Sequence, residues 1–283
     1  MLLSAEHLSI NFGSRQLLDD VNFYLNEGDK VGVIGINGTG KSTFLKVLSG
    51  VTEPDGGTIS RNPNVQVSLL PQNPAMEESA TVLEQVFLHF PAEFRELNEY
   101  EAKAMLNRLG ITDFAQKVGT LSGGQRKRVA LAAALIHPAD VLILDEPTAG
   151  LDPNERIRFR NLISELSEDR IVLLSTHIVS DIEYIASEIL LMKDGRITLS
   201  GTAEEVIASM PERVWLFSVP KEQVDRYLAA YRVSNLKTTP AGATLRVLSA
   251  ECPAIGAVET AATLEDVFLH YFGESAGDSD GTV

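Results

Sequence analysis

The chain has 283 residues, 44% of them apolar, which is enough for one large α/β domain with a smaller one attached. Its formal net charge of −15 repels phosphate backbones and argues against nucleic acid as a partner. No apolar stretch approaches the roughly 20 residues of a spanning helix, and the polar Ser4, Glu6 and His7 argue against a cleaved leader. The single cysteine, Cys252, excludes an internal disulfide, so we expect a cytoplasmic protein.

The first elements are two strands and a helix. Leu8, Ile10 and Phe12 alternate with polar neighbours, which predicts a half-buried strand. A second strand is predicted over Lys30 to Ile36 and a helix over Lys41 to Leu48. The glycine-rich turn between these two elements is the most informative part of the sequence.

This turn, Gly35-Ile36-Asn37-Gly38-Thr39-Gly40-Lys41-Ser42, fits the phosphate-loop pattern G-x-x-x-x-G-K-[ST] in full. Glycines let backbone N–H groups turn inward around an anion, and the following helix adds its positive N-terminal end. Lys41 can then reach the outer phosphates of a nucleotide, and Ser42 can offer its hydroxyl to Mg²⁺. The alternative, a glycine-rich connection with a surface lysine, does not account for the strand before it and the helix after it.

Helical periodicity follows from about residue 73 to residue 138. Val82 to Phe87, Ala102 to Leu109 and Val129 to Leu135 each carry apolar residues at helical spacing, which predicts a helical subdomain inserted into the sheet domain. A basic cluster, Arg126 to Arg128, precedes the last stretch. This cluster either contacts a phosphate or forms a solvated helix face.

Two apolar runs, Val141 to Leu144 and Ile171 to Leu174, flank a helical stretch over Glu155 to Leu166. Strands that alternate with helices are typical of a parallel, doubly wound sheet. A hairpin is predicted over Glu188 to Ser200. The pattern then indicates a small C-terminal α/β module over residues 211–273 and a flexible tail over 274–283. The elements predicted in this module are strands at Val214 to Val219 and Thr244 to Leu248, and helices at Glu222 to Tyr231 and Leu264 to Phe272.

Acidic residues end the first of these runs. Asp145 and Glu146 follow Leu144, at the strand end where an open parallel sheet binds ligands. Beside a phosphate loop, Asp145 would hold a water of the Mg²⁺ shell and Glu146 would polarise the attacking water. An ordinary strand cap is the alternative. His177 follows the second run at the same predicted edge, where an imidazole can reach the γ-phosphate or orient the water.

Leu121-Ser122-Gly123-Gly124-Gln125, before the last helical stretch, resembles the signature of ATP-binding cassette (ABC) ATPases. Gln72 resembles the Q-loop glutamine of that family, Asp152 the D-loop aspartate and His177 the switch histidine. Phe12 lies where the family places the aromatic ring that stacks on adenine. The resemblance covers residues 1 to about 205.

The resemblance implies a P-loop ATPase fold with a parallel-sheet core, N-terminal antiparallel strands and a nucleotide-binding domain over residues 1–210. It implies ATP and Mg²⁺ as cofactors, with Lys41, Glu146 and His177 as catalytic residues and Ser42, Gln72 and Asp145 as metal ligands. The implied nucleotide contacts are Phe12, Gly35, Asn37, Gly38, Thr39, Gly40, Lys41, Ser42, Thr43, Gln72, Ser122, Gly123, Gly124, Gln125, Asp145 and Asp152.

The family also implies a homodimer of cassettes packed head to tail, in which the signature of one chain closes over the nucleotide held by the other. Two branches remain open. Residues 1 to about 137 look like the soluble F branch, which acts on ribosomes, whereas residues from about 141 look like the ATPase subunit of a bacterial exporter, which binds a transmembrane permease at the inner face of the membrane. A recombinant or engineered chimera joined near residues 136–141 would explain both likenesses, and such a chain could bind nucleotide without a coupled partner.

Overall fold

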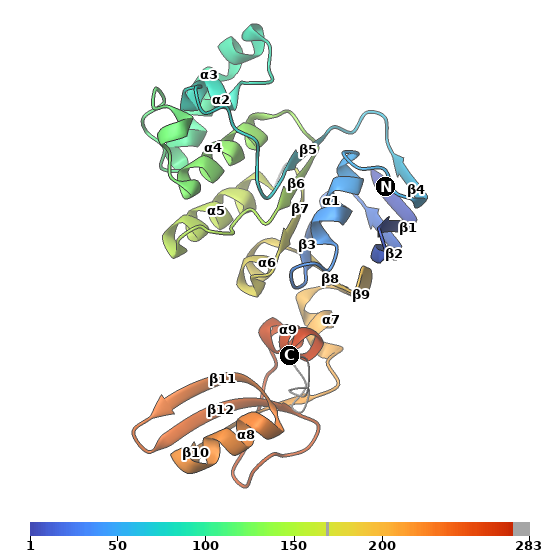
Figure 1. Ribbon diagram of the computed structural model, residues 1–283, viewed down its shortest axis with the longest axis vertical. Helices are drawn as coiled ribbons and strands as arrows, with labels where there is room; N and C mark the ends of the chain where they lie inside the picture. Colours follow the sequence, from blue (N-terminus) through green and yellow to red (C-terminus); the bar gives the residue numbers. More distant parts are fainter. Residues whose placement is uncertain (168–169, 274–283) are drawn as a thin grey trace. The chain divides into compact units, whose positions relative to one another are not determined.

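The computed structural model describes residues 1–167 and 170–273 (Figure 1). The chain divides into two compact units between Thr198 and Leu199, and the boundary predicted at residues 210 and 211 lies beyond that division. The predicted flexible tail over 274–283 lies outside the described residues. Within residues 1–167 and 170–273, no helix has the length and hydropathy of a membrane span.

A three-stranded antiparallel sheet in the order β2-β1-β4 begins the first unit. Leu8 and Ile10 point into the core as predicted, but Phe12 is 78% exposed at the turn into β2, so the half-buried pattern ends before it. The strands of this sheet are β1 (Leu3–Phe12), β2 (Arg15–Leu25) and β4 (Gly56–Arg61).

The second sheet has six strands in the order β5-β6-β7-β3-β8-β9, and the pairs from β5 through β8 are parallel, as predicted. All residues of β6 and β7 are buried, which explains their unbroken apolar runs. The carboxyl ends of β3, β6 and β7 therefore meet at one edge. The strands are β3 (Lys30–Ile34), β5 (Val67–Leu70), β6 (Val141–Asp145), β7 (Ile171–Thr176), β8 (Glu188–Lys193) and β9 (Arg196–Gly201).

Strand β3 ends at Ile34, two residues before its predicted end at Ile36. The chain turns away here at Gly35, where an ideal Cβ would lie 2.4 Å from the carbonyl oxygen of Met192. Only a residue without a side chain can pass so close to another backbone. The phosphate loop thus starts directly at the sheet edge.

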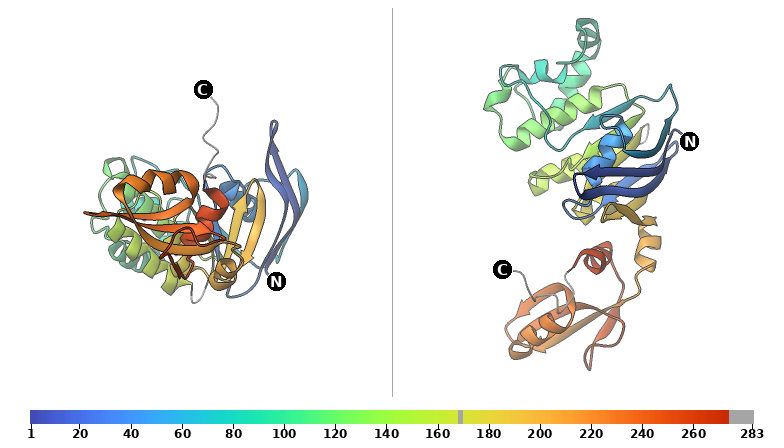
Figure 2. Two further views of the ribbon diagram at one scale, coloured as in Figure 1. Left: turned by 90° about the horizontal axis from the view of Figure 1, so that it is seen from below. Right: turned by 45° about the vertical axis from the view of Figure 1, so that its right-hand side comes forward.

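Helix α1 (Lys41–Ser49) lies between the two sheets (Figure 1). Its Phe44 packs edge-to-face on Phe23 of β2, with ring centroids 5.5 Å apart, in a core shared by both sheets. Helices α5 (Pro153–Leu166) and α6 (Val179–Ile185) cover the other face of the six-stranded sheet (Figure 2). Because both faces of this sheet are covered, its strand ends form the accessible edge.

The inserted helical subdomain is confirmed. It holds α2 (Val82–Val86), α3 (Ala92–Arg108), a 3₁₀ turn (Val118–Thr120) and α4 (Gly123–Ile136). Four residues after α4 the chain enters β6, the strand that ends at Asp145.

The second unit has a four-stranded antiparallel sheet in the order β11-β12-β10-β13. Phe217, Leu245 and Val247 of this sheet form a small core with Tyr227 of α8. Helix α8 is shorter than its predicted range, because Lys221–Gln223 form a 3₁₀ turn before it. The elements are α7 (Ala203–Ala208), β10 (Arg213–Pro220), α8 (Val224–Ala230), β11 (Arg232–Thr239), β12 (Gly242–Ser249), β13 (Val258–Thr260) and α9 (Leu264–Phe272).

Candidate functional site

The glycine-rich loop between β3 and α1 has the backbone that a phosphate cradle requires. Gly38 and Gly40 have φ of 83° and 100°, in the left-handed region. Gly40 is the N-cap of α1, and no side chain of the described residues caps that helix end. An ideal Cβ on Gly40 would lie 2.4 Å from the carbonyl oxygen of Leu17 in β2. The loop is therefore packed against β2, and the uncapped helix end is suited to binding an anion.

Lys41 is buried at the base of this loop. Its Nζ donates to the carbonyl oxygens of Gly35 at 2.8 Å and Ile36 at 3.1 Å. The same atom lies 3.3 Å from Oε1 of Glu146, and both side chains are about 5% exposed or less. Lys41 and Glu146, 105 positions apart in the sequence, thus form one buried ion pair.

Asp145 ends β6 and accepts hydrogen bonds from two hydroxyl groups. Its Oδ1 accepts from Ser42 Oγ at 2.9 Å and from Ser175 Oγ at 2.7 Å, and the residue is 2% exposed. A hydroxyl and a carboxylate are hard oxygen ligands of the kind that Mg²⁺ prefers. Ser175 is absent from the sequence-predicted site. Its position at the carboxyl end of β7, two residues before His177, is the signal that could have identified it.

Glu146 and His177 are also in contact. Nδ1 of His177 lies 2.7 Å from Oε2 of Glu146, and the imidazole is 46% exposed whereas the carboxylate is 4% exposed. Glu146 has φ of 48°, a strained conformation for a residue with a side chain. Its N–H donates to Ser175 Oγ at 3.1 Å, which helps to hold that conformation. A solvent-facing imidazole next to a buried carboxylate is suited to orienting a general base.

Lys41, Ser42 and Glu146 border a pocket of about 320 Å³, whereas Asp145 and His177 are not among its lining residues. Gln72, which follows β5, lines it as predicted, and Arg15 adds a contact that the sequence did not indicate, because its Nη2 donates to the carbonyl oxygen of Gly38 at 2.8 Å. Thr39 faces its own loop, since its hydroxyl donates to the carbonyl oxygen of Ile36. The lining residues are Leu17, Asn37, Gly38, Gly40, Lys41, Ser42, Thr43, Gln72 and Glu146.

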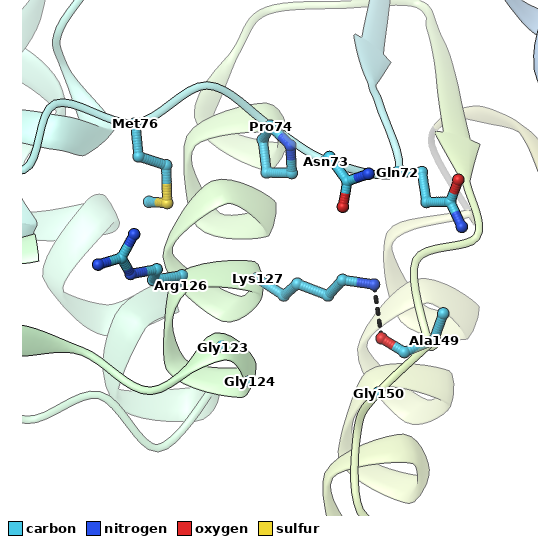
Figure 3. Close-up of a pocket in the computed structure, with 10 residues that line it drawn as sticks. All are labelled: Gln72, Asn73, Pro74, Met76, Gly123, Gly124, Arg126, Lys127, Ala149 and Gly150. Carbon is cyan, nitrogen blue, oxygen red and sulfur yellow. Dashed lines mark hydrogen bonds between the residues drawn. The ribbon is translucent and has the colours of Figure 1, made fainter. Parts of the chain in front are cut away.

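The remaining predicted residues lie elsewhere. Ser122 is the N-cap of α4, and it forms a capping box with Gln125. Gly123 and Gly124 line a second pocket of about 370 Å³, which lies between the start of α4 and the stretch around Ala149 (Figure 3). Gln72 lines both pockets.

Phe12 and Asp152 are not among the residues that line either of these two pockets. Asp152 is the N-cap of α5, and its Oδ1 accepts from the N–H of Glu155 at 2.9 Å. The structure therefore brings the phosphate loop, Asp145, Glu146 and His177 together, and it leaves Ser122 to Gln125 as a separate set.

The basic cluster before the core of α4 is engaged within the chain rather than solvated. Arg126 pairs with Glu78, and Arg128 Nη2 lies 2.9 Å from Glu155 Oε1. Lys127 Nζ donates to the carbonyl oxygen of Ala149. Burial lowers the pKa of Lys127, and the negative charges of the acidic pair at the end of β6 oppose that shift.

A family model described as "ABC transporter" matches residues 18–149. Three curated relatives are similar in sequence. An uncharacterized ABC transporter ATP-binding protein of Bacillus subtilis, YxlF, is 33% identical over 80% of this chain and 79% of its own length. A second from that organism, YfmR, is 35% identical over 75% of this chain, which spans 39% of that longer relative. The Nod factor export ATP-binding protein I of Burkholderia thailandensis is 34% identical over 70% of each chain.

Solved structures have the same fold. The ATP-binding subunit of an ABC transporter aligns with a TM-score of 0.65 at 26% identity, over 74% of this chain and 92% of that subunit. The dimeric ATP-binding cassette MJ0796, described in a post-hydrolysis state bound to ADP and Pi, aligns with a TM-score of 0.63 at 23% identity, over 71% of this chain and 98% of that cassette.

A single alignment with YxlF covers 80% of the chain and so must cross residues 136–141. One relative therefore aligns on both sides of the point at which a join was predicted. The comparisons give no support to a chain joined from two sources at that point.

Proposed function

Because the chain belongs to the family of ABC transporter ATP-binding proteins, we propose that it binds and hydrolyses Mg-ATP as the nucleotide-binding subunit of an exporter. The observation that carries the proposal is the contact between Lys41, Glu146 and His177 at the end of the phosphate loop. This contact joins a cation for phosphate to a buried base at the pocket, and that base to an orienting imidazole.

The phosphates of ATP would lie against the backbone of Gly38 to Ser42, at the N-terminal end of α1. Lys41 then exchanges the carbonyl oxygens of its own loop for the outer phosphates. The exposed ring of Phe12 would stack on the adenine. Ser42 and Asp145 would hold Mg²⁺ with Gln72, and bound Mg²⁺ would neutralise charge on the phosphates.

Hydrolysis follows from the position of Glu146. A water oxygen attacks the γ-phosphorus, the bond from that phosphorus to the bridging oxygen breaks, and Glu146 accepts the proton that the water loses. ADP and inorganic phosphate result. His177 holds the Glu146 carboxylate from the solvent side, while Ser175 holds its backbone.

Two chains are needed for a complete site. Ser122, Gly123 and Gly124 start a helix with a positive N-terminal end, yet they line a pocket other than that of Lys41. In a head-to-tail dimer, this helix end closes over the γ-phosphate held by the partner chain. The homodimer would therefore enclose two nucleotides.

The coupled partner would be a transmembrane permease, which would hold this subunit at the inner face of the membrane. An apolar hollow of about 320 Å³ lies between the stretch after β5 and the helical subdomain, with Pro74, Phe90 and Ala134 among its lining residues. A short cytoplasmic helix of a permease fits such a hollow. The likeness to a Nod factor export protein supports transport outward, and the net charge of −15 disfavours a ribosome as the partner.

The test is Glu146→Gln, which keeps the size of the side chain but removes the base. We expect ATP turnover to fall about a hundredfold or more, and Mg-ATP to convert the variant from a 30.8 kDa monomer to a dimer in light scattering. Glu183→Gln, on the exposed side of α6, is the matched control and should behave as the parent. A Glu146→Gln protein that stays monomeric, or that hydrolyses ATP at the parent rate, would overturn the proposal.

A further inference from the structure

Lys127 joins the helix that carries Gly123 and Gly124 to the turn that follows the acidic strand end. Its Nζ donates to the carbonyl oxygen of Ala149 at 2.5 Å and lies 3.5 Å from the carbonyl oxygen of Glu146 (Figure 3). Both acceptors are backbone atoms. The contact therefore restrains the backbone of this turn rather than a side chain.

The turn that Lys127 contacts is the strained one. Glu146 has φ of 48°, and the N–H of Ala149 donates to the carbonyl oxygen of Glu146 at 3.1 Å to close the turn. A side-chain-bearing residue keeps such a conformation only where its surroundings hold it. An ammonium that bonds both ends of the turn, from a half-buried position with little competing water, is such a restraint.

The same helix holds the far end of this segment. Arg128 Nη2 lies 2.9 Å from Glu155 Oε1, with both side chains less than a fifth exposed, and Glu155 Oε2 accepts from the N–H of Asp152. Helix α4 thus contacts the segment from Glu146 to Glu155 at both ends of that segment, through Lys127 at the start and through Arg128 at the end. A movement of α4 must be transmitted to Glu146 through these contacts, and Lys127 is the one nearer to it.

We propose that Lys127 is a positioning residue that couples the two nucleotide sites of the dimer. The inference rests on the proposed head-to-tail arrangement, in which Gly123 and Gly124 serve the nucleotide of the partner while Glu146 serves the nucleotide of its own chain. Closure of α4 on one nucleotide then sets the backbone of Glu146 at the other. Lys127 touches neither nucleotide.

The experiment compares Lys127→Met, which removes the ammonium and keeps an unbranched stem as far as Cε, with Lys127→Arg, which keeps the charge. Lys103→Met is the matched control, since Lys103 is a half-exposed lysine of α3 whose partner is Glu99. Each purified full-length protein is assayed for ATP affinity as a monomer, for turnover against ATP concentration, and for its melting temperature.

We expect Lys127→Met to bind ATP within twofold of the parent, to lose about tenfold in turnover, and to lower the Hill coefficient from near 2 towards 1. Lys127→Arg should restore part of the cooperativity, and Lys103→Met should match the parent. A cooperative Lys127→Met protein overturns the inference, as does one whose turnover falls with the Hill coefficient unchanged.

Failure of the proposed function has a different signature, because the parent itself would then show neither ATP turnover nor an ATP-dependent dimer. If Lys127→Met does not fold, Lys127→Gln, which keeps a polar donor on a shorter chain, is measured in the same way. An unchanged Hill coefficient in that variant also overturns the inference.

Discussion

The two glycines that cap helix α1 can distinguish the effect of the phosphate loop's shape from the effect of backbone strain alone. Gly40 and Gly50 lie at opposite ends of this helix, with φ of 100° and 80°. An alanine at either position has to adopt a left-handed conformation, which costs roughly 1–2 kcal/mol. The two positions differ in their surroundings, because an ideal Cβ meets nothing within 4 Å at Gly50 but lies 2.4 Å from the Leu17 carbonyl oxygen at Gly40.

The magnitude follows from that distance. Real Cβ atoms essentially never approach within 3.0 Å of another heavy atom, so 3.0 minus 2.4 leaves at least 0.6 Å of movement in the phosphate loop of Gly40→Ala. A displacement of about 1 Å in a positioned site can lower the reaction rate about 100-fold. We therefore expect ATP affinity to fall at least about tenfold, or about 1.4 kcal/mol, in Gly40→Ala, and to stay within twofold of the parent in Gly50→Ala.

The assay is equilibrium titration with ATP, together with urea unfolding of each variant. Lys41→Ala defines the signal of a protein that does not bind. Gly50→Ala should lose only the small part of its unfolding free energy that comes from the left-handed strain, whereas Gly40→Ala should lose more, since a backbone atom must also shift. Equal ATP affinities in the two variants would refute the reasoning, because the clash with Leu17 would then have no effect on the loop.

Three further substitutions test other parts of the molecule. Phe12→Ala should weaken ATP binding about tenfold and leave the melting temperature unchanged, since an exposed ring that stacks on a base contributes about 1–3 kcal/mol. If titration shows that the variant binds ATP as tightly as the parent, the stacking role is wrong. Thr148→Val removes the 2.6 Å hydrogen bond to buried Asp181 and should cost about 2 kcal/mol in urea unfolding, whereas Thr148→Ser should not. Burial opposes ionisation of Asp266, but hydrogen bonds, chiefly from Arg246, hold its pKa below its ordinary value. Asp266→Asn should thus destabilise the second unit by about 3 kcal/mol at pH 7, and the difference should shrink as the pH falls below about 4; a difference that is constant with pH would count against the ion pair.

Most of the predicted elements have long apolar runs or clear periodicity, but β2 was missed although Val21, Phe23 and Leu25 alternate with exposed residues. The buried runs of β6 and β7 and the hairpin of β8 and β9 are confirmed within a few residues. Strand β4, by contrast, has no buried residue and no apolar alternation to reveal it. It is a strand because its backbone pairs with β1, and such pairing leaves no pattern in the side chains of an exposed strand.

The contacts of the candidate site also divide into those that the sequence predicted and those that it did not. The predicted residues Ser42, Asp145, Glu146 and His177 lie together because they follow the carboxyl ends of β6 and β7 or begin the helix that follows β3 in the same sheet. Arg15 reaches the carbonyl oxygen of Gly38 from another sheet, and no local pattern in the sequence marks it. In the C-terminal module β10, β12, α8 and α9 were predicted within a few residues, whereas α7, β11, β13 and the antiparallel order of the strands were not.

The sequence by itself determined the chemistry of the phosphate loop, because Gly35 to Ser42 carries its cradle, its cation and its hydroxyl within eight consecutive residues, and local backbone geometry is enough to arrange them. Only the tertiary structure decided what Lys127 does. A basic residue on a helix can face solvent, a phosphate or a carbonyl, and its choice depends on which backbone the fold brings within reach. Here the fold brings the turn of Glu146 and Ala149 to Lys127. The cation whose contacts the sequence could not predict therefore lies against the backbone of Glu146, the general base of the candidate site.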